Sequence, residues 1–455
     1  MSLTYPLFHH RLEQIIAWHA GRPVSAGKFL MDVVHTAGRL PTATHVINLC
    51  DNRYHFMVGF AACILKDQLT LLPPNGTPGV INELTRDYAD CICLADRPMD
   101  NLEISQILVN PLPAETRISD QVIPQIAQDR LAAILFTSGS TGKPAANPKY
   151  WGDLQKGAQL AADRFGIRSD RVTSLVATVP PQHMYGLETS ILIPWFGGVG
   201  VYSGRPLFPA DVRDALASLE APRVLITTPL HLRACVGAEL EWPDIEFLIS
   251  ATAPLSKPLA ESAERMLNTQ VLEIYGSTET GSIASRRTIE GDRWTLYEEM
   301  HLSQTAGQFQ AQGPQLPQPM PLGDQLELLD GPLFKLLGRH SDMLKIAGKR
   351  ASLADLNHKL NEIEGVLDGA FVIPDSGESA VRRLTALVVA PTLNKETLLE
   401  ELAKSLDPAF LPRPLHLVDK LPRSSTGKLP REALLRLLKQ LHSSHGNAKA
   451  FEPER

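Results

Sequence analysis

The chain has 455 residues, 21% charged and 44% hydrophobic, with a formal net charge of -6. This length exceeds what one compact core can fill, so we expect at least two domains. The acidic balance provides no basic surface of the kind that a duplex binder needs, which disfavours nucleic acid as a substrate. The first ten residues lack a basic region followed by an apolar run, and no apolar stretch is long enough to cross a bilayer. We therefore expect a soluble, cytoplasmic protein without a membrane span.

Apolar segments rich in β-branched residues alternate with helical patterns in the first half of the chain. We expect buried strands at Thr44–Cys50, Leu131–Phe136, Val172–Thr178 and Arg223–Thr227. Helical periodicity covers Leu154–Phe165 and Ala210–Leu219. Strands and helices in alternation predict an α/β fold with mostly parallel sheets.

The alternation breaks over residues 307–322, which are rich in Gln, Pro and Gly, and a shorter α/β segment with an apolar run at Leu384–Ala390 begins after Asp342. We expect a large N-terminal domain at residues 1–340 and a small, mobile C-terminal α/β domain at residues 341–455, with the hinge near Ser341. The polar, aperiodic residues from Ser443 onward are expected to be frayed.

The cysteines are odd in number and scattered: Cys50, Cys63, Cys91, Cys93 and Cys235. This pattern fits reduced core thiols better than a disulfide framework. Cys91 and Cys93 could hold a metal, but no second Cys/His pair stands at zinc-site spacing. Alternation around them predicts a strand with both thiols on one face, and hence a structural role.

The segment Thr137–Lys143 reads Thr-Ser-Gly-Ser-Thr-Gly-Lys and follows a predicted buried strand. Loops at the carboxyl ends of such strands are where α/β sheets usually bind ligands. Its glycines allow close approach of the backbone to phosphate oxygens, and its hydroxyls add donors. It is not a Walker loop, because the first Gly is too close to Gly142 and Pro144 follows the lysine. By itself the segment is either a phosphate loop or an ordinary turn.

Three further segments follow in order: Tyr275–Glu279 (Tyr-Gly-Ser-Thr-Glu), Gly338–Asp342 (Gly-Arg-His-Ser-Asp) and Ser425–Lys428 (Ser-Thr-Gly-Lys). With the first segment, they make the chain resemble the adenylate-forming superfamily from about residue 40 to residue 440. The resemblance implies an ATP-dependent, AMP-forming enzyme that activates a carboxylic acid, with ATP and Mg²⁺ as cofactors.

The resemblance also implies roles for the nucleotide-binding residues. The Ser/Thr/Gly loop would clamp the outgoing phosphates through Thr137, Ser138, Gly139, Ser140, Thr141, Gly142 and Lys143. The floor of the nucleotide site would be Tyr275, Gly276, Ser277 and Thr278, with the tyrosine ring against adenine and the threonine on the α-phosphate. Glu279 would bind Mg²⁺, since a carboxylate is the hard oxygen ligand that magnesium prefers. The alternative is a Gly-Ser turn in which Thr278 and Glu279 cap a helix.

The remaining implied roles concern the ribose, the acid and the reaction itself. Asp324 would accept the ribose hydroxyls and Arg339 would reach ribose or phosphate, although most such residues are plain surface charges. Lys428 would bridge the substrate carboxylate and the α-phosphate, where a mobile cation stabilises the developing charge; the alternative is a basic surface loop. His183 would lie beside the substrate carboxylate, unless it is simply a packed histidine.

Two departures from the family pattern bear on the substrate. The usual Pro-Lys-Gly continuation of the first loop is absent, and Lys149 is a candidate replacement. No Phe-Asp pair follows His183 to receive an α-ammonium, which disfavours amino acids. The resemblance places the acid pocket at Met184–Glu188, Thr227–Leu232 and Ser250–Leu255, a mainly apolar lining suited to an aryl or aliphatic acid.

The compact length, Lys149 with Trp151, and the segment Lys345–Leu353 are most similar to short adenylating ligases of aryl polyene and xanthomonadin-type pigment pathways. This resemblance implies that an aryl acid is loaded onto the phosphopantetheine thiol of an acyl carrier protein, an acidic partner that Lys345, Lys349 and Arg350 could attract. Three alternatives stay open: a fatty acyl-CoA or acyl-ACP synthetase, a ligase using CoA as its thiol, and a silent adenylate-binding protein. Lys428, Glu279 and Asp324 argue against the last.

Overall fold

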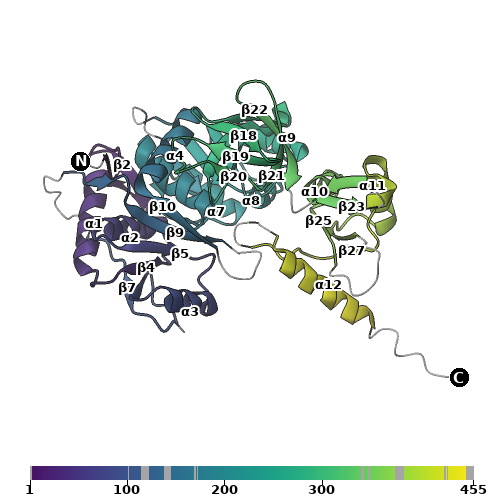
Figure 1. Ribbon diagram of the computed structural model, residues 1–455. Coiled ribbons are helices and arrows are strands. Elements are labelled where there is room, and N and C mark those ends of the chain that lie inside the picture. The colour runs from purple at the N-terminus through teal and green to yellow at the C-terminus, as the bar shows by residue number, and fades with distance from the viewer. Residues whose placement is uncertain are drawn as a thin grey trace.

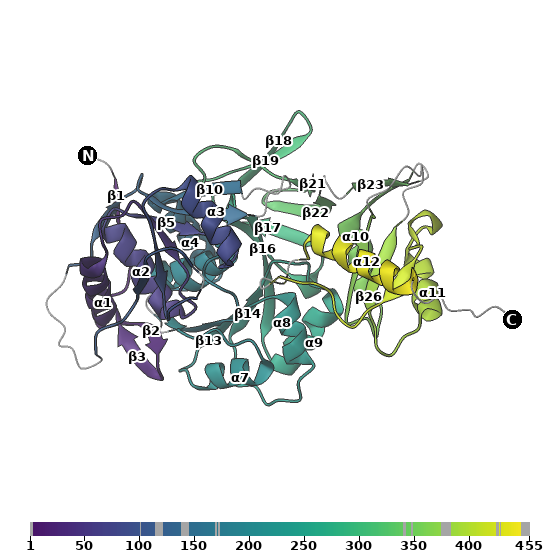
Figure 2. The same ribbon diagram turned by 90° about the horizontal axis from the view of Figure 1, so that it is seen from below.

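The computed structural model describes residues 3–100, 102–113, 122–137, 145–168, 171, 173–339, 343–346, 349–374, 384–424, 427 and 429–446. Figures 1 and 2 show a larger lobe, formed by the first three quarters of the chain, beside a smaller C-terminal lobe. Two large sheets dominate the first lobe. Within the described residues, no helix combines the length and apolar character that a bilayer span requires.

The first sheet has six strands, and its four inner pairings from β9 to β7 are parallel. Its order is β10 (Ala145–Tyr150), β9 (Leu131–Thr137), β5 (Leu69–Leu72), β4 (His45–Asn48), β6 (Cys91–Ala95) and β7 (Gln106–Leu108). Strand β10 is antiparallel to β9, so the predicted phosphate loop connects the two strands of a hairpin. Its residues 138–144 lie outside the described part of the chain.

The second sheet has eleven strands, parallel from β15 to β2 and antiparallel at both ends. Its order is β21 (Asp324–Leu328), β22 (Leu333–Arg339), β17 (Arg293–Leu296), β16 (Gly281–Arg287), β15 (Gln270–Ser277), β14 (Phe247–Ser250), β13 (Arg223–Thr227), β11 (Ser174–Ala177), β12 (Gly200–Tyr202), β2 (Ile15–His19) and β3 (Arg22–Ser25). The predicted α/β fold with parallel sheets is confirmed, and the antiparallel ends are additions that strand–helix alternation alone did not predict.

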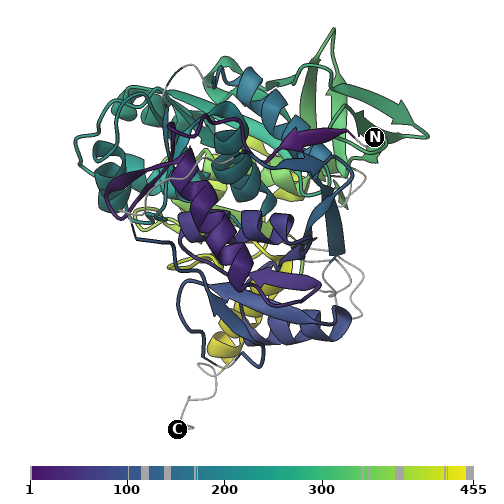
Figure 3. The same ribbon diagram turned by 90° about the vertical axis from the view of Figure 1, so that its left-hand side faces the viewer.

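Helices separate and cover the two sheets. Between them lie α1 (Ala26–Arg39), α2 (Arg53–Leu65), α4 (Trp151–Arg164), α5 (Met184–Leu187), the π-helical turn Glu188–Leu192 and α6 (Ile193–Gly197), which share one core with both sheets. Helix α3 (Pro78–Asp87) packs on the outer face of the first sheet, and α7 (Pro209–Ala217), α8 (Pro229–Val236) and α9 (Lys257–Leu267) cover the outer face of the second. Figure 3 shows α1 and α2 from the N-terminal side. Helix α2 is apolar nearly all round, as a helix buried between two layers must be.

Regular elements occur in two segments outside the strand–helix alternation. Residues 307–322 contain strands β19 (Gln308–Gln312) and β20 (Met320–Pro321), which form a three-stranded sheet with β18 (His301–Thr305). In β19 the alternate residues Phe309 and Ala311 are buried in the main core, and the glutamines between them are more exposed. The prediction that the chain is frayed from Ser443 onward is wrong for its first residues, because α12 (Arg431–Gly446) continues to Gly446.

The five cysteines form no disulfide, and burial raises the pKa of Cys93 to about 12.

The smaller lobe has its own hydrophobic cores, which begin at Leu344, whereas the cores of the larger lobe end at Phe334. Its elements are β23 (Met343–Ile346), β24 (Lys349–Ser352), α10 (Leu353–Asn361), β25 (Asp368–Val372), β26 (Thr385–Val389), α11 (Lys395–Ser405), β27 (Leu415–Leu417) and α12. The division at residues 340 and 341 stays a prediction, because residues 340–342, including the expected hinge Ser341, lie outside the described residues.

Candidate functional site

A cavity of about 210 Å³ lies where strands of both sheets end. Strands β4, β5 and β6 run parallel, so the segments after their carboxyl ends meet at one edge of the sheet. His183, which precedes α5, reaches the same cavity from the second sheet. The lining consists of Leu49, Asp51, Pro73, Pro74, Asn75, Gly76, Ala95, Asp96, Arg97, Met99, Pro180, Gln182, His183 and Arg205.

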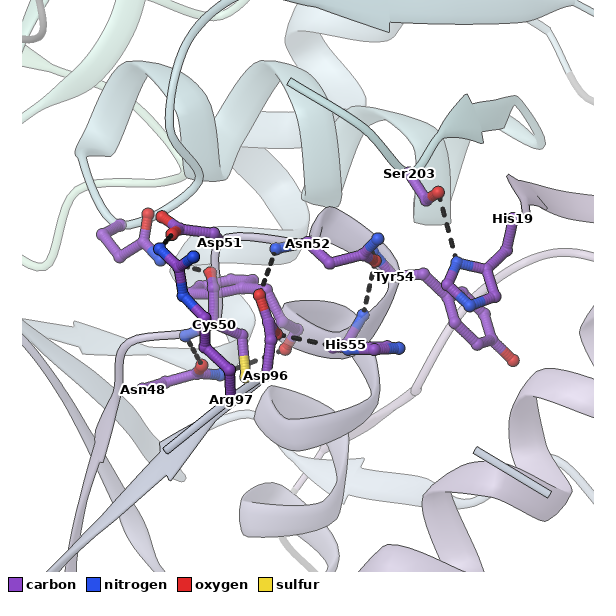
Figure 4. Close-up of polar contacts among 12 residues, drawn as sticks. His19, Asn48, Cys50, Asp51, Asn52, Tyr54, His55, Asp96, Arg97 and Ser203 are labelled. Carbon is purple, nitrogen blue, oxygen red and sulfur yellow. Dashed lines mark hydrogen bonds and ion pairs between the residues drawn. The ribbon is translucent and has the colours of Figure 1, made fainter. Parts of the chain in front are cut away.

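A polar cluster at the N-terminus of α2 shapes one wall of this cavity (Figure 4). Asp96 accepts a hydrogen bond from the backbone N–H of Asn52 at 2.6 Å, and its other oxygen lies 3.2 Å from Nδ1 of His55. Burial works to raise the pKa of Asp96, but the hydrogen bonds from His55 and Asn52 outweigh it, and the net shift is downward. The carboxylate therefore stays charged and holds the segment that carries Arg97, whose guanidinium lies 3.6 Å from Asp51.

Arg53 is a fully buried cation behind the cavity. Its guanidinium donates to the carbonyls of Ala177 at 3.2 Å and Val179 at 2.7 Å, and its backbone N–H donates to Ser203 at 2.7 Å. Burial lowers its pKa to about 9, so it remains a cation at neutral pH. Arg53 thus ties together the segments leading to His183 and Arg205. Sequence analysis missed it, because one Arg near a helix start carries no motif.

The segment Tyr275–Glu279 forms the hairpin turn between β15 and β16 rather than a helix cap. A Cβ atom at Gly276 would lie only 2.0 Å from the carbonyl oxygen of Gly281, so this close approach of the two strands requires glycine. The side chains of Ser277 and Thr280 lock the turn, since each hydroxyl accepts from the other residue's backbone N–H at 3.2 and 3.1 Å. Thr278 is half-buried, and Glu279 is exposed.

Tyr275 and Asp324, 49 positions apart, meet at this turn. The tyrosine hydroxyl donates to Oδ2 of Asp324 at 2.7 Å. The tyrosine ring packs against Trp294 and Phe334, with centroids 5.7 and 5.6 Å away. Arg339 pairs with Asp324 in the β21–β22 register, although its side chain lies outside the described atoms. Two of the predicted nucleotide residues therefore share one site.

Lys149 is buried on β10 and donates from Nζ to the backbone carbonyl of Glu279 at 3.0 Å. Burial lowers its pKa, and the nearby carboxylates of Glu279, Glu188 and Asp153 oppose that shift. The ammonium is thus directed at the Tyr275–Glu279 turn. Lys149 was predicted to replace the lysine that is missing from the first loop. In the structure its ammonium contacts the turn that is predicted to bind the nucleotide.

Two of the three predicted acid-pocket segments, Thr227–Leu232 and Ser250–Leu255, begin at the carboxyl ends of β13 and β14, and the third, Met184–Glu188, comprises α5 and the residue after it. The hydroxyl of Tyr185 contacts the carbonyls of Thr227 and Ile249, each at 2.9 Å, which holds the two strand ends together. Thr252 adopts a left-handed backbone with φ of 80°, an unusual conformation for a β-branched residue. Among the described residues, the buried hydroxyls of Ser250 and Thr252 have no hydrogen-bond partner. Two buried polar atoms without a described partner therefore lie at these strand ends.

The C-terminal loop that contains Lys428 reaches this pocket. A Cβ atom at Gly427 would lie 3.6 Å from Oγ1 of Thr228 and 3.7 Å from Oγ1 of Thr252. Arg423 anchors the loop by donating to the carbonyl of Gly427 at 2.6 Å. Lys428 itself lies outside the described residues. The preceding residue, Gly427, nevertheless shows that this loop of the smaller lobe lies against Thr228 and Thr252 of the larger lobe.

The residues present fit a nucleotide with a divalent cation. An exposed carboxylate at Glu279 supplies the hard oxygen ligand that magnesium takes, and the half-buried hydroxyl of Thr278 is a donor suited to a phosphate oxygen. Asp324 supplies a carboxylate acceptor at the other side of Tyr275.

Comparison with known proteins gives the family. The AMP-binding enzyme family matches residues 40–331. A 4-coumarate–CoA ligase of Rhodobacter capsulatus is 30% identical over 234 residues, which cover 51% of this chain and 58% of that protein. The 4-coumarate–CoA ligase of Halorhodospira halophila is 27% identical over 327 residues, covering 70% of this chain and 80% of that protein.

Solved structures agree at the level of the fold. ATP-bound MatB from Rhodopseudomonas palustris superposes with a TM-score of 0.79 at 18% identity, covering 94% of this chain and 97% of that one. The o-succinylbenzoate coenzyme A synthetase from Bacillus subtilis, in complex with ATP and magnesium ion, gives 0.77 at 18% identity, covering 92% and 96%. The family match covers well over half of the chain. The predicted class of enzyme, an ATP-dependent, AMP-forming acid–thiol ligase, is confirmed by this match and by the ligases among the relatives. The chain belongs to the AMP-binding enzyme family.

Proposed function

We propose that this protein adenylates an aryl carboxylic acid with ATP and Mg²⁺ and transfers the acyl group to the phosphopantetheine thiol of an acyl carrier protein. The observation that carries the proposal is the convergence of three distant segments: the Tyr275–Glu279 turn with Asp324, the pocket strands ending at Thr227 and Ser250, and the loop at Gly427. A nucleotide, an acid and a mobile cation would have to meet in this way for adenylation.

In the first half-reaction, a carboxylate oxygen of the acid attacks the α-phosphorus of ATP, and the bond to pyrophosphate breaks. Bound Mg²⁺ would offset the charge of the phosphates, and Glu279 would hold it. Thr278 would donate to the α-phosphate, while Lys428 would stabilise the charge that accumulates there. His183 would orient the acid by lying beside its carboxylate. The loop of residues 137–143 would hold the departing phosphates.

The acid class follows from the pocket and from the relatives. The segments at the ends of β13 and β14 are mainly apolar, and the buried hydroxyls of Ser250 and Thr252, which are unpaired among the described residues, would supply a few polar contacts. Such a site suits a ring with one or two hydroxyl groups. Relatives named as 4-coumarate–CoA ligases, and a benzoate–CoA ligase of Thauera aromatica that is 25% identical over 341 residues, support an aromatic acid.

In the second half-reaction, the thiol sulfur attacks the acyl carbonyl and AMP leaves. The cavity lined by His183 and Arg205, together with the charged residues Asp51, Asp96 and Arg97, would receive the narrow phosphopantetheine arm. We further propose that residues 341–455 rotate as a domain about Ser341 between the two half-reactions, a hinge motion that a few residues absorb. Lys349, which pairs with Asp407, would contribute to docking of an acidic carrier protein.

The test is carboxylate-dependent ATP–pyrophosphate exchange with Mg²⁺, measured over hydroxybenzoates, cinnamates, fatty acids and amino acids. Exchange with an aryl acid supports the proposal, exchange only with fatty acids assigns an acyl ligase instead, and exchange with none overturns it. The best acid is then offered with holo acyl carrier protein or CoA at equal concentration. Faster thioester formation with CoA would overturn the carrier-protein part.

A further inference from the structure

Two buried charged residues flank the Tyr275–Glu279 turn. Lys149 is 8% exposed, and its Nζ donates to the carbonyl of Glu279 on one side of the turn. Glu188 is 3% exposed, and both its carboxylate oxygens accept from the backbone N–H of Ser282, at 3.2 and 3.0 Å, on the other side. The hydroxyl of Ser282 donates to Glu188 as well, at 2.7 Å. The two groups thus hold two backbone positions, Glu279 within the locked Ser277–Thr280 turn and Ser282 two residues after it.

The two charges also act on each other. Burial raises the pKa of Glu188, and the hydrogen bonds from Ser282 and the charge of Lys149 oppose that rise. The carboxylate of Glu188 lies close to the backbone at Gly281, where a Cβ atom would come within 3.6 Å of Oε1.

Buried charges of opposite sign contribute little net stability, because desolvation of both charges offsets their attraction. An apolar side chain of similar volume could fill either position without that cost. The benefit of this arrangement is therefore expected in the geometry of the turn rather than in the stability of the fold.

The two residues come from different parts of the predicted site. Lys149 lies on the strand that follows the phosphate loop, and Glu188 follows the short helix that begins after His183. Their contacts bring both segments to the same hairpin. A displacement of the acid-side helix would thus be transmitted to Glu279.

We propose that Lys149 and Glu188 are positioning residues that fix the Tyr275–Glu279 turn for the nucleotide and its metal, without touching either. This inference rests on the proposed function. The two side chains hold backbone atoms of the turn, which leaves the side chains of Thr278 and Glu279 available for the ligand.

The test is direct binding of ATP with Mg²⁺ by isothermal titration calorimetry in the absence of any acid, using the full chain. We expect Lys149→Met to weaken binding by about tenfold or more, the usual consequence of losing a hydrogen bond to a charged group. In ATP–pyrophosphate exchange, the KM for ATP should rise while the KM for the acid stays within about twofold. Lys66→Met, at an exposed lysine after α2, is the matched control and should bind as the wild type does.

The double variant Lys149→Met with Glu188→Gln separates positioning from simple damage. Removing both charges leaves neither one buried alone, so the double variant should bind ATP more tightly than Lys149→Met does. Wild-type affinity in a folded Lys149→Met variant would overturn the inference. If that variant does not fold, Glu188→Gln alone, nearly isosteric, must weaken binding for the inference to stand. A wild-type protein that binds no ATP would instead overturn the proposed function.

Discussion

The hydrogen bond between Tyr275 and Asp324 is the contact by which the predicted nucleotide site can be tested most sharply. Tyr275→Phe removes only the hydroxyl that donates to Asp324 at 2.7 Å. The ring itself stays in place, because Trp294 and Phe334 pack against it. The variant therefore removes one hydrogen bond from the carboxylate and leaves in place the ring that is predicted to face adenine.

The expected magnitude follows from the partners. A hydrogen bond to a charged acceptor contributes about 1.5–3 kcal/mol, and partial exposure of both side chains places this one at or below the lower end. About 1 to 1.5 kcal/mol corresponds to a rise of roughly five- to twelvefold in the dissociation constant for ATP. Asp324→Asn keeps the shape of the side chain but removes its charge, and it should weaken binding by about tenfold or more.

The assay is calorimetric titration with ATP and Mg²⁺ of the wild type, both single variants and the double variant. If Tyr275 acts by orienting Asp324, adding Tyr275→Phe to Asp324→Asn should change the affinity by less than about twofold. Fully additive losses would refute this reasoning, as would single variants that both bind ATP as tightly as the wild type.

Three further predictions concern catalysis, stability and pH. Lys428→Ala should reduce ATP–pyrophosphate exchange by orders of magnitude while calorimetry still detects ATP binding; near-normal exchange would exclude the catalytic role. Arg53→Met leaves the buried carbonyls of Ala177 and Val179 without this donor and should lower the free energy of unfolding by about 2–4 kcal/mol in urea titrations, and an unchanged urea midpoint would contradict it. Burial lowers the pKa of His10 to about 4, so the unfolded chain takes up its proton near pH 6.5 before the folded one, and stability should fall as the pH drops from 6.5 to 4. His10→Gln should reduce this fall, measured as the difference between urea midpoints at pH 7 and pH 5; an equal difference in both proteins would count against it.

Strand positions were the most accurate sequence-based predictions. The segment Arg223–Thr227 coincides with β13, and Leu131–Phe136 differs from β9 by one residue. Both strands are buried on both faces, so their apolar runs are unambiguous. The segment at 307–322 was harder, because its strands are short, with only Phe309 and Ala311 buried in β19, and its Gln-rich composition resembles that of a loop.

The sequence by itself determined the chemistry that the protein has available. Hydroxyls, glycines and charges at Thr137–Lys143, Tyr275–Glu279, Asp324 and Lys428 stand in an order that identifies the family, and their residue types carry the chemistry of phosphate and metal binding.

Only the tertiary structure decided which groups act together. It connected Lys149 to the carbonyl of Glu279, Glu188 to Ser282, and Arg53 to the strand ends behind the cavity. None of these contacts follows from spacing, since each joins residues far apart in the chain through a backbone atom that every residue type possesses. Burial of a charge costs free energy unless the charge is hydrogen-bonded, and its partners can be any backbone groups that the fold brings near it. The role of such a residue is therefore visible only in the folded structure.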